Sequence, residues 1–350
     1  MSLISVPTIP PKPAPTLVGI ARLAAESPLV RERAEVEYFA LPCRSALNRE
    51  SSGRMPFAWT INPYRGCEFG CKYCYARYTH EFMEMWDGKD FEHKIYAKVE
   101  APELLRAELR QAKDKGLPIA LGTATDPYQP AEKQFEITRR MLEVFIEFEG
   151  LEFSITTKSV LILRDLELLR RVSDRHRFSV HMTVTTTDER LARLLEPKAP
   201  PPIRRLEAVK QLSEAGVRVG VNAMPILPGL NDFDRHLDAL ARAASAAGAR
   251  FLYGNILFLT PSAMKQFMPF LEKEFPRLAK HYRKLYAHSA YLNGDYKNRI
   301  TKLLAELRAR YGLEGNYGEP PSAAKHPQLA LPFETLGGSA TSSQLLTPCG

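Results

Sequence analysis

Short apolar runs rich in β-branched residues alternate along this chain with longer segments of helical period. The runs span 57–62, 119–124, 153–157, 178–184, 217–224 and 251–258. The helical segments span 102–115, 132–148, 163–175, 203–215 and 233–247, and a shorter one spans 188–195. This repetition predicts an α/β fold, a partial (β/α)6 TIM-like barrel with a helical C-terminal extension. Because the chemistry of such barrels takes place at the C-terminal ends of the strands, polar residues there are the first candidates for function.

The segments outside the alternating pattern define the expected domains. Residues 1–40 are proline-rich and show little periodicity, which predicts a flexible N-terminal arm. The barrel itself is expected over 41–260, and 261–318 is expected to form a basic helical C-terminal extension that would cover the barrel mouth and exclude water. The tail 319–350 is rich in Pro, Ser, Thr, Gly and Ala, so we expect it to be disordered.

The positive charge is concentrated in the C-terminal extension. The whole chain carries a formal net charge of +8, and the stretch between Leu271 and Gly312 holds ten cations against four anions. Tyrosines are interleaved with these cations at positions 282, 286, 291 and 296. The pattern suits a surface that tracks phosphates and stacks on bases. It equally suits a solvated pair of amphipathic helices whose tyrosines pack on the core.

Composition favours a cytoplasmic protein without a membrane partner. No stretch approaches the roughly 20 apolar residues that span a bilayer, and the proline-rich start lacks the apolar run of a signal peptide. The chain has five cysteines, three of them within eight residues, which suits ligation better than a disulfide framework.

Those three cysteines follow the first predicted strand. They are Cys67, Cys71 and Cys74, within Asn-Pro-Tyr-Arg-Gly-Cys-Glu-Phe-Gly-Cys-Lys-Tyr-Cys-Tyr. Thiolates spaced Cx3Cx2C on one loop can bind three irons of a cubane and leave the fourth iron open. A structural zinc site needs four ligands, and Cys43 is the candidate for the fourth, although it lies outside any compact spacing. A nucleic-acid-binding module stabilised by zinc is therefore the alternative from a different class.

The cysteine motif, with Tyr73 before its last cysteine, resembles the signature of the radical S-adenosylmethionine (radical SAM) superfamily. The resemblance implies a [4Fe-4S] cluster whose open iron binds S-adenosylmethionine. Reductive cleavage then gives a 5′-deoxyadenosyl radical that abstracts a hydrogen atom from the substrate. It also implies an electron donor such as flavodoxin or ferredoxin.

Further segments resemble the spore photoproduct lyase-like branch, also called DNA repair photolyase-like proteins. These segments are Gly-Thr-Ala-Thr-Asp-Pro-Tyr-Gln-Pro at 122–130, Ser-Ile-Thr-Thr-Lys-Ser at 154–159, Glu-Pro at 196–197 with arginines at 204 and 205, and Pro-Ile-Leu-Pro-Gly-Leu-Asn-Asp at 225–232. The resemblance extends from about residue 40 to residue 258. In spore photoproduct lyase the radical opens a methylene-bridged thymine dimer, and a cysteine returns a hydrogen atom to the product.

This chain departs from that branch at the hydrogen donor, because no cysteine lies between Tyr75 and Pro348. Cys43 or a tyrosine such as Tyr128 would have to take the role, or the substrate differs. We favour a different substrate. It remains plausibly a nucleic-acid lesion or base, and the alternatives are a peptide, a modified RNA or a small metabolite.

The resemblance also assigns roles to polar residues at the strand ends. Thr123, Thr125 and Asp126 match the place where the superfamily binds the amino group of S-adenosylmethionine, although the same residues are typical of a turn. Lys158 would pair with the cofactor's carboxylate. Thr185 would reach the ribose, and Asn222 lies near the expected adenine position.

Overall fold

The main sheet has seven strands in the order β11-β10-β9-β8-β7-β4-β3. The computed structural model describes residues 17–51, 53, 55–111 and 117–315. The strands are β3 (Asn48–Arg49), β4 (Trp59–Ile61), β7 (Ile119–Leu121), β8 (Glu152–Thr157), β9 (Arg177–Thr183), β10 (Val219–Ile226) and β11 (Leu252–Ile256). The strands from β4 to β11 run parallel, and β3 is antiparallel to β4. The predicted α/β fold with a parallel sheet is confirmed, and the barrel is not closed within the described residues.

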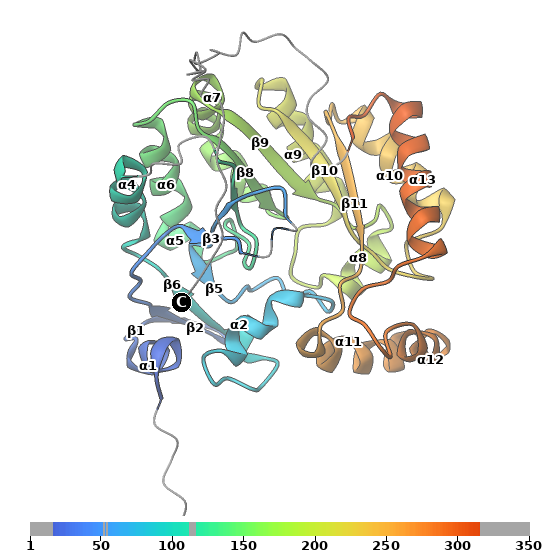
Figure 1. Cartoon of the computed structure of the whole chain (residues 1–350), viewed down its shortest axis with the longest axis horizontal. Helices are drawn as coiled ribbons and strands as arrows, with labels where there is room; N and C mark the ends of the chain where they lie inside the picture. The colour runs from blue at the N-terminus through green and yellow to red at the C-terminus, as the bar shows by residue number, and fades with distance from the viewer. Residues whose placement is uncertain (1–16, 52, 54, 112–116, 316–350) are drawn as a thin grey trace, which may run out of the picture. The chain divides into compact units, whose positions relative to one another are not determined.

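Helices connect the parallel strands and pack on one face of the sheet (Figure 1). They are α4 (Ala101–Gln111), α5 (Glu132–Phe135), α6 (Ile137–Ile146), η2 (Val160–Asp165), α7 (Leu166–Arg175), α8 (Glu189–Leu195), α9 (Pro202–Glu214) and α10 (Asp234–Ala246). Burial alternates along β8, where Phe153 and Ile155 belong to the core and Ser154 and Thr156 are half-buried. The residues between these core positions, Ser154 and Thr156, therefore point to the opposite face of the sheet, which is the inner face of the partial barrel.

A second sheet of four strands holds the start of the cysteine loop. Its strands are β1 (Leu29–Arg33), β2 (Val36–Ala40), β6 (Lys94–Ala97) and β5 (Tyr64–Arg65), in that spatial order. Helix α1 (Gly19–Glu26) precedes it, and η1 (Tyr75–Arg77), α2 (Tyr78–Glu81) and α3 (Asp90–His93) lie between β5 and β6.

This second sheet differs from the flexible arm predicted over residues 1–40. Residues 1–16 lie outside the described part, but the rest of the segment forms α1, β1 and β2. The reason is a pairing distant in sequence, since β2 runs parallel to β6 and buries Val36 and Tyr38 in the main core. A periodicity argument cannot detect a strand whose partner comes so much later.

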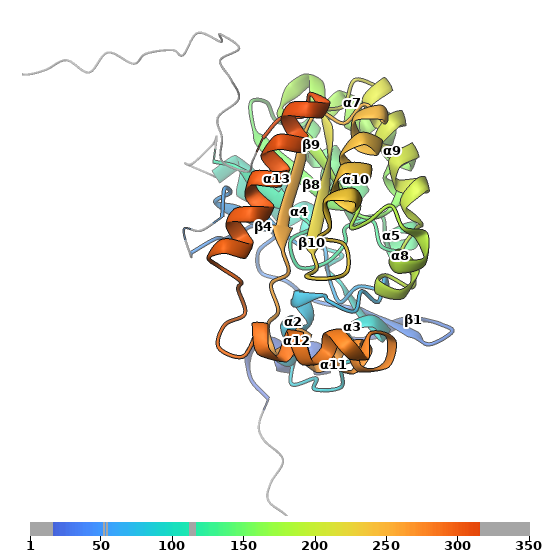
Figure 2. The ribbon, with the colours of Figure 1, turned by 90° about the vertical axis from the view of Figure 1, so that its right-hand side faces the viewer.

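The C-terminal extension is helical, as predicted over 261–318. It consists of α11 (Pro261–Glu274), α12 (Pro276–Leu285) and α13 (Asp295–Tyr311). Helices α11 and α12 lie below the C-terminal ends of the strands in Figures 1 and 2, while α13 runs beside α10 and β11. The predicted disordered tail 319–350 lies outside the described residues. Among the described helices, none has the length and apolarity to cross a bilayer.

Two hydrophobic clusters organise the interior. The larger fills the space between the sheet and its covering helices. The smaller packs Phe69, Tyr73 and the motif cysteines against α8, α11 and α12. Tyr282 and Tyr286 of the extension are buried in this smaller cluster, so these two tyrosines pack on the core, as the second interpretation of the basic segment expected.

Candidate active site at the cysteine loop

The cysteine loop begins at a glycine that no other residue could replace without displacement. Gly66 has φ +82°, and a Cβ there would lie 2.8 Å from the carbonyl oxygen of Lys94 and 2.9 Å from that of Phe91. The next residue, Cys67, donates its backbone N–H to the same Phe91 oxygen at 2.9 Å. The small sheet and α3 therefore fix where the first cysteine stands.

Two side chains from the loop after β7 clamp the cysteine loop. The Thr125 hydroxyl donates to the carbonyl oxygen of Gly66 at 2.6 Å, and Gln129 Nε2 donates to the same oxygen at 3.0 Å. Gln129 Oε1 accepts the backbone N–H of Glu68 at 3.0 Å. Thr125, expected to contact the cofactor, thus holds the loop that bears the cysteines. Gln129 was not among the predicted site residues, and its only sequence signal is its place in the Asp-Pro-Tyr-Gln-Pro turn.

The three motif thiols lie close enough to influence one another. Burial, together with the neighbouring motif cysteines, raises the pKa of Cys67 and raises that of Cys71 to about 12. Lys158 and Arg205 act in the opposite direction on the pKa of Cys71. Since thiolates are the metal-binding form, a bound cationic cluster would supply the charge that these buried sulfurs need.

The donor set fits an iron–sulfur cluster, because three thiolates on one loop are the soft ligands that such clusters take. Zinc would require its ligands to converge on one atom at about 2.0–2.3 Å. A cubane requires only one thiolate for each of three irons, so the sulfurs can stand farther apart.

A buried ion pair supports the cysteine loop through Tyr73. Glu196 and Arg205 pair at 2.5 Å, with 1% of each side chain exposed. Arg205 also donates to the carbonyl oxygens of Pro200 at 2.7 Å and Thr183 at 3.0 Å. Burial opposes the charge on Glu196, but Arg205 and Lys158 outweigh it, and the pKa of the carboxyl is lowered.

Tyr73 and Thr185 complete this network. Tyr73, between the second and third cysteines, donates its hydroxyl to Glu196, and Thr185 donates to the same carboxylate oxygen at 2.7 Å. The Tyr73 and Thr185 hydroxyl oxygens are 3.1 Å apart. The ion pair therefore contacts the cysteine loop through Tyr73. Thr185, just after β9, hydrogen-bonds to the same Glu196 carboxylate.

The charges of Asp126 and Lys158 act on the motif thiols, and their predicted contacts with S-adenosylmethionine stay a prediction. The Asp126 carboxylate accepts the Thr157 hydroxyl at 2.7 Å and the backbone N–H groups of Tyr128 and Lys158 at 2.9 and 2.7 Å. Asp126 therefore stabilises a turn, which was the alternative to cofactor binding in the sequence analysis. Its charge also raises the pKa of Cys67. Burial opposes the charge on Lys158, but Cys71 and Glu196 outweigh it and raise the pKa of the ammonium.

The remaining predicted cofactor residues stand at neighbouring strand ends. Thr123 accepts a hydrogen bond from Asn62 Nδ2 at 3.1 Å, and its backbone oxygen accepts the Tyr75 hydroxyl. Asn222 is 3% exposed, and its side chain hydrogen-bonds with His181.

Cys43 and Tyr128 pack in the larger hydrophobic cluster, whereas Cys67 and Cys74 pack against the smaller one. Cys43 packs against the larger cluster, and the charges that act on it are those of Lys98, Glu100 and Glu108. Tyr128 is fully buried in that same cluster, beside Asp165 and Glu132. Their suggested role as hydrogen donors stays a prediction, and it would require a path to the site that these contacts do not supply.

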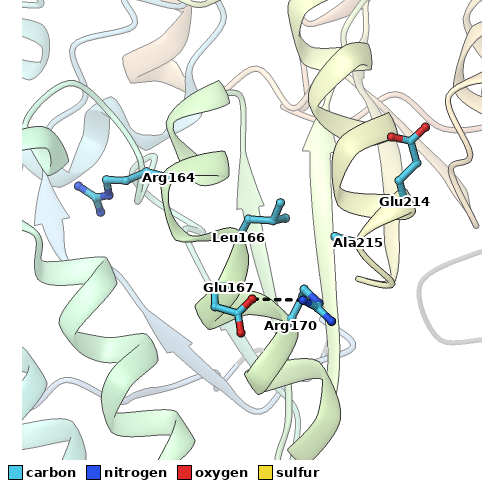
Figure 3. A pocket seen from close by; sticks show the side chains of 6 residues that line it. All are labelled: Arg164, Leu166, Glu167, Arg170, Glu214 and Ala215. Carbon is cyan, nitrogen blue, oxygen red and sulfur yellow. Dashed lines mark hydrogen bonds and ion pairs between the residues drawn. The ribbon is translucent and has the colours of Figure 1, made fainter.

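A surface hollow lies away from this site. It is lined by Arg164, Leu166, Glu167 and Arg170 and by the C-terminal end of α9 (Figure 3). Its arginines are already occupied, since Arg164 pairs with Glu132 and Asp165, and Arg170 pairs with Glu167. The hollow therefore offers no unpaired arginine for a ligand.

Comparison with known proteins agrees with the site. The model of the family "Radical SAM superfamily" matches residues 61–241. An uncharacterized protein of Mycobacterium tuberculosis, Rv2578c, is 34% identical over 82% of this chain and 84% of its own length. The uncharacterized protein MJ0683 of Methanocaldococcus jannaschii is 30% identical over 62% of this chain and 76% of its own length.

Among solved structures, spore photoproduct lyase complexed with dinucleoside spore photoproduct has the same fold. The TM-score is 0.55 at 17% identity, and the match covers 77% of this chain and 76% of the lyase chain. The mutant lyase with bound AdoMet and the same dinucleoside matches with a TM-score of 0.54 at 15% identity, over 77% of each chain.

Proposed function

Because the chain belongs to the radical SAM superfamily, we propose that it is an enzyme that cleaves S-adenosylmethionine reductively and abstracts a hydrogen atom from its substrate. Cys67, Cys71 and Cys74 would hold the [4Fe-4S] cluster. The cluster supplies the electron that breaks the carbon–sulfur bond of S-adenosylmethionine. The observation that carries the proposal is the set of three mutually interacting thiols on one clamped loop, at the ends of the parallel strands.

The residues around the loop would bind and orient S-adenosylmethionine. Asp126 keeps lone pairs beyond its three hydrogen bonds and would accept from the cofactor's ammonium, with Thr123 beside it. Lys158, charged and next to Cys71, would pair with the carboxylate. Asn222, whose side chain hydrogen-bonds with His181, would contact the adenine, and Thr185 would face the ribose.

The substrate class that we propose is nucleic acid, as a lesion or a single base. The fold similarity to spore photoproduct lyase and the basic C-terminal extension support it. The absence of a cysteine between Tyr75 and Pro348 argues that the reaction differs from the lyase's own. A peptide, a modified RNA or a small metabolite is the alternative substrate. Flavodoxin or ferredoxin would deliver the electron.

The test is formation of 5′-deoxyadenosine by the reconstituted protein, reduced with dithionite under anaerobic conditions. Ultraviolet-irradiated DNA, undamaged DNA, RNA and a peptide mixture are supplied in parallel. The proposal expects irradiated or undamaged nucleic acid to raise the rate, and Cys71→Ala to abolish it under every condition. Stimulation by the peptide mixture alone would move the substrate class away from nucleic acid.

A further inference from the structure

Three aromatic rings gather beside the last motif cysteine. Tyr75 directly follows Cys74, Phe258 follows β11, and Tyr291 lies in the connection between α12 and α13. Phe258 stacks on Tyr291 with ring centroids 4.3 Å apart and an interplanar angle of 23°. Tyr75 and Phe258 are 6.1 Å apart at 51°. These three rings, here called the aromatic ladder, join the cysteine loop to the C-terminal extension.

The aromatic ladder presents ring surface to solvent. Tyr75 is 39% exposed and Tyr291 is 49% exposed, and Phe258 between them is half-buried. Exposed apolar side chains that form a continuous patch mark a binding site more often than scattered ones do. Tyr282 on α12 and Tyr286 directly after it do not contribute, since both are buried.

Backbone hydrogen bonds hold the ladder in place. The N–H of Leu259 donates to the carbonyl oxygen of Ala290 at 3.0 Å, which fixes the residue after Phe258 to the residue before Tyr291. Tyr286 donates its hydroxyl to the carbonyl oxygen of Leu257 at 3.0 Å. The Tyr75 hydroxyl is bonded to the Thr123 carbonyl. The rings are thus preorganised, which lowers the entropy lost when a ligand stacks on them.

Cations flank the ladder on both sides in the sequence. Helix α12 carries Arg277, Lys280 and Lys284 on its exposed positions, and α13 begins with Asp295 and carries Lys297. No ion pair within the described residues involves these four cations, whereas Arg283 pairs with Glu272 and Arg299 with Asp232. Exposed aromatic rings flanked in the sequence by exposed cations without an ion pair match a chain of flat bases joined by phosphates.

We propose that the aromatic ladder of Tyr75, Phe258 and Tyr291 is a stacking platform for a base of a single-stranded or unpaired nucleic acid, with phosphates bound by the cations of α12 and α13. The inference rests on the proposed function and names where its substrate binds. Stacking on rings tolerates different bases, so the platform would add affinity without strict sequence choice. It would also bring the bound strand next to the cysteine loop.

The experiment measures binding of fluorescein-labelled single-stranded DNA and RNA to the anaerobically reconstituted full chain by fluorescence anisotropy. Tyr291→Ala and Phe258→Ala are each expected to weaken binding about 5- to 150-fold. Tyr291→Phe keeps the ring and is expected to bind as the unchanged protein does. Phe233→Ala is the matched control, because Phe233 is 46% exposed at the start of α10 and lies outside the ladder.

Salt dependence separates the two parts of the platform. Lys284→Ala and Lys297→Ala are expected to reduce the slope of log Kd against log salt, whereas Tyr291→Ala leaves it unchanged. The inference would be overturned if Tyr291→Ala and Phe258→Ala left the affinity unchanged. It would also be overturned if Phe233→Ala changed the affinity as much as those two variants do. Binding of a peptide but no oligonucleotide would overturn it as well.

The failure of the platform is distinguishable from the failure of the proposed function. Formation of 5′-deoxyadenosine without any substrate reports on the cysteine loop alone. If the unchanged protein forms 5′-deoxyadenosine but the ladder variants bind oligonucleotides as it does, only the platform is refuted. If the unchanged protein forms no 5′-deoxyadenosine, the proposed function is refuted.

Discussion

Replacing Arg205 by methionine tests the buried ion pair behind the cysteine loop. The substitution leaves Glu196 charged and unpaired at a position where 1% of its side chain is exposed. It also removes the donors to the carbonyl oxygens of Pro200 and Thr183. Removing one partner of a buried pair costs about 3–5 kcal/mol, because the remaining charge stays desolvated. We expect the free energy of unfolding of the cluster-free protein to fall by about that amount.

Urea unfolding under anaerobic conditions measures this loss from the midpoint and the slope. Arg170→Met is the matched control, since Arg170 forms an exposed pair with Glu167 and the same substitution should cost about 1 kcal/mol or less. Adding Glu196→Gln to Arg205→Met should recover part of the loss, because no buried charge is then left unpaired. Equal effects of Arg205→Met and Arg170→Met would refute the reasoning.

Three further predictions concern the cysteine loop and its supporting sheet. Gly66→Ala should prevent iron incorporation, whereas Gly216→Ala should not. Both glycines have φ +82°, but a Cβ at Gly66 would meet two carbonyl oxygens and a Cβ at Gly216 meets nothing within 4 Å. Iron content after reconstitution measures the difference, and equal iron content in the two variants would contradict the clash. Gln129→Leu leaves the carbonyl of Gly66 and the N–H of Glu68 with fewer partners, so we expect a loss of about 1–3 kcal/mol in urea unfolding together with reduced iron content; full loading at unchanged stability would contradict the clamp. Burial lowers the pKa of His80 to about 4, so the unfolded chain binds a proton at higher pH than the folded chain. The free energy of unfolding should therefore fall by roughly 3 kcal/mol as the pH drops from about 6.5 to about 4. His80→Gln should flatten this pH dependence in urea unfolding at several pH values, and an unchanged slope would exclude His80 as its source.

Periodicity was sufficient to predict the parallel strands of the main sheet and the helices between them, but not the antiparallel edge strand β3. The predicted run 153–157 corresponds to β8 (Glu152–Thr157), and the segment 203–215 corresponds to α9 (Pro202–Glu214). Both patterns are local, because the face that a residue occupies in a strand or helix depends only on its near neighbours. The hairpin of β1 and β2 could not be predicted in this way, since its burial depends on pairing with β6.

The site was predictable in part for the same reason. The spacing of the cysteines and the polar strand ends are local signals, and in the structure the charges of Asp126 and Lys158 act together with those of the thiols. The role of Thr125 depends on where Gly66 comes to lie, which only the folded chain determines. The same holds for Gln129 and for the pair of Glu196 and Arg205, whose partners come from other strands and loops.

The most direct test of the account measures iron, sulfide and 5′-deoxyadenosine in the same anaerobic preparation, with Cys67→Ala, Cys71→Ala and Cys74→Ala beside the unchanged protein and Cys43→Ala as the control. The account predicts a cluster that forms 5′-deoxyadenosine from S-adenosylmethionine on reduction, is lost or inactive in each motif variant, and is retained in Cys43→Ala. A colourless protein that binds zinc and no iron, and that loses its zinc in Cys43→Ala, would contradict it.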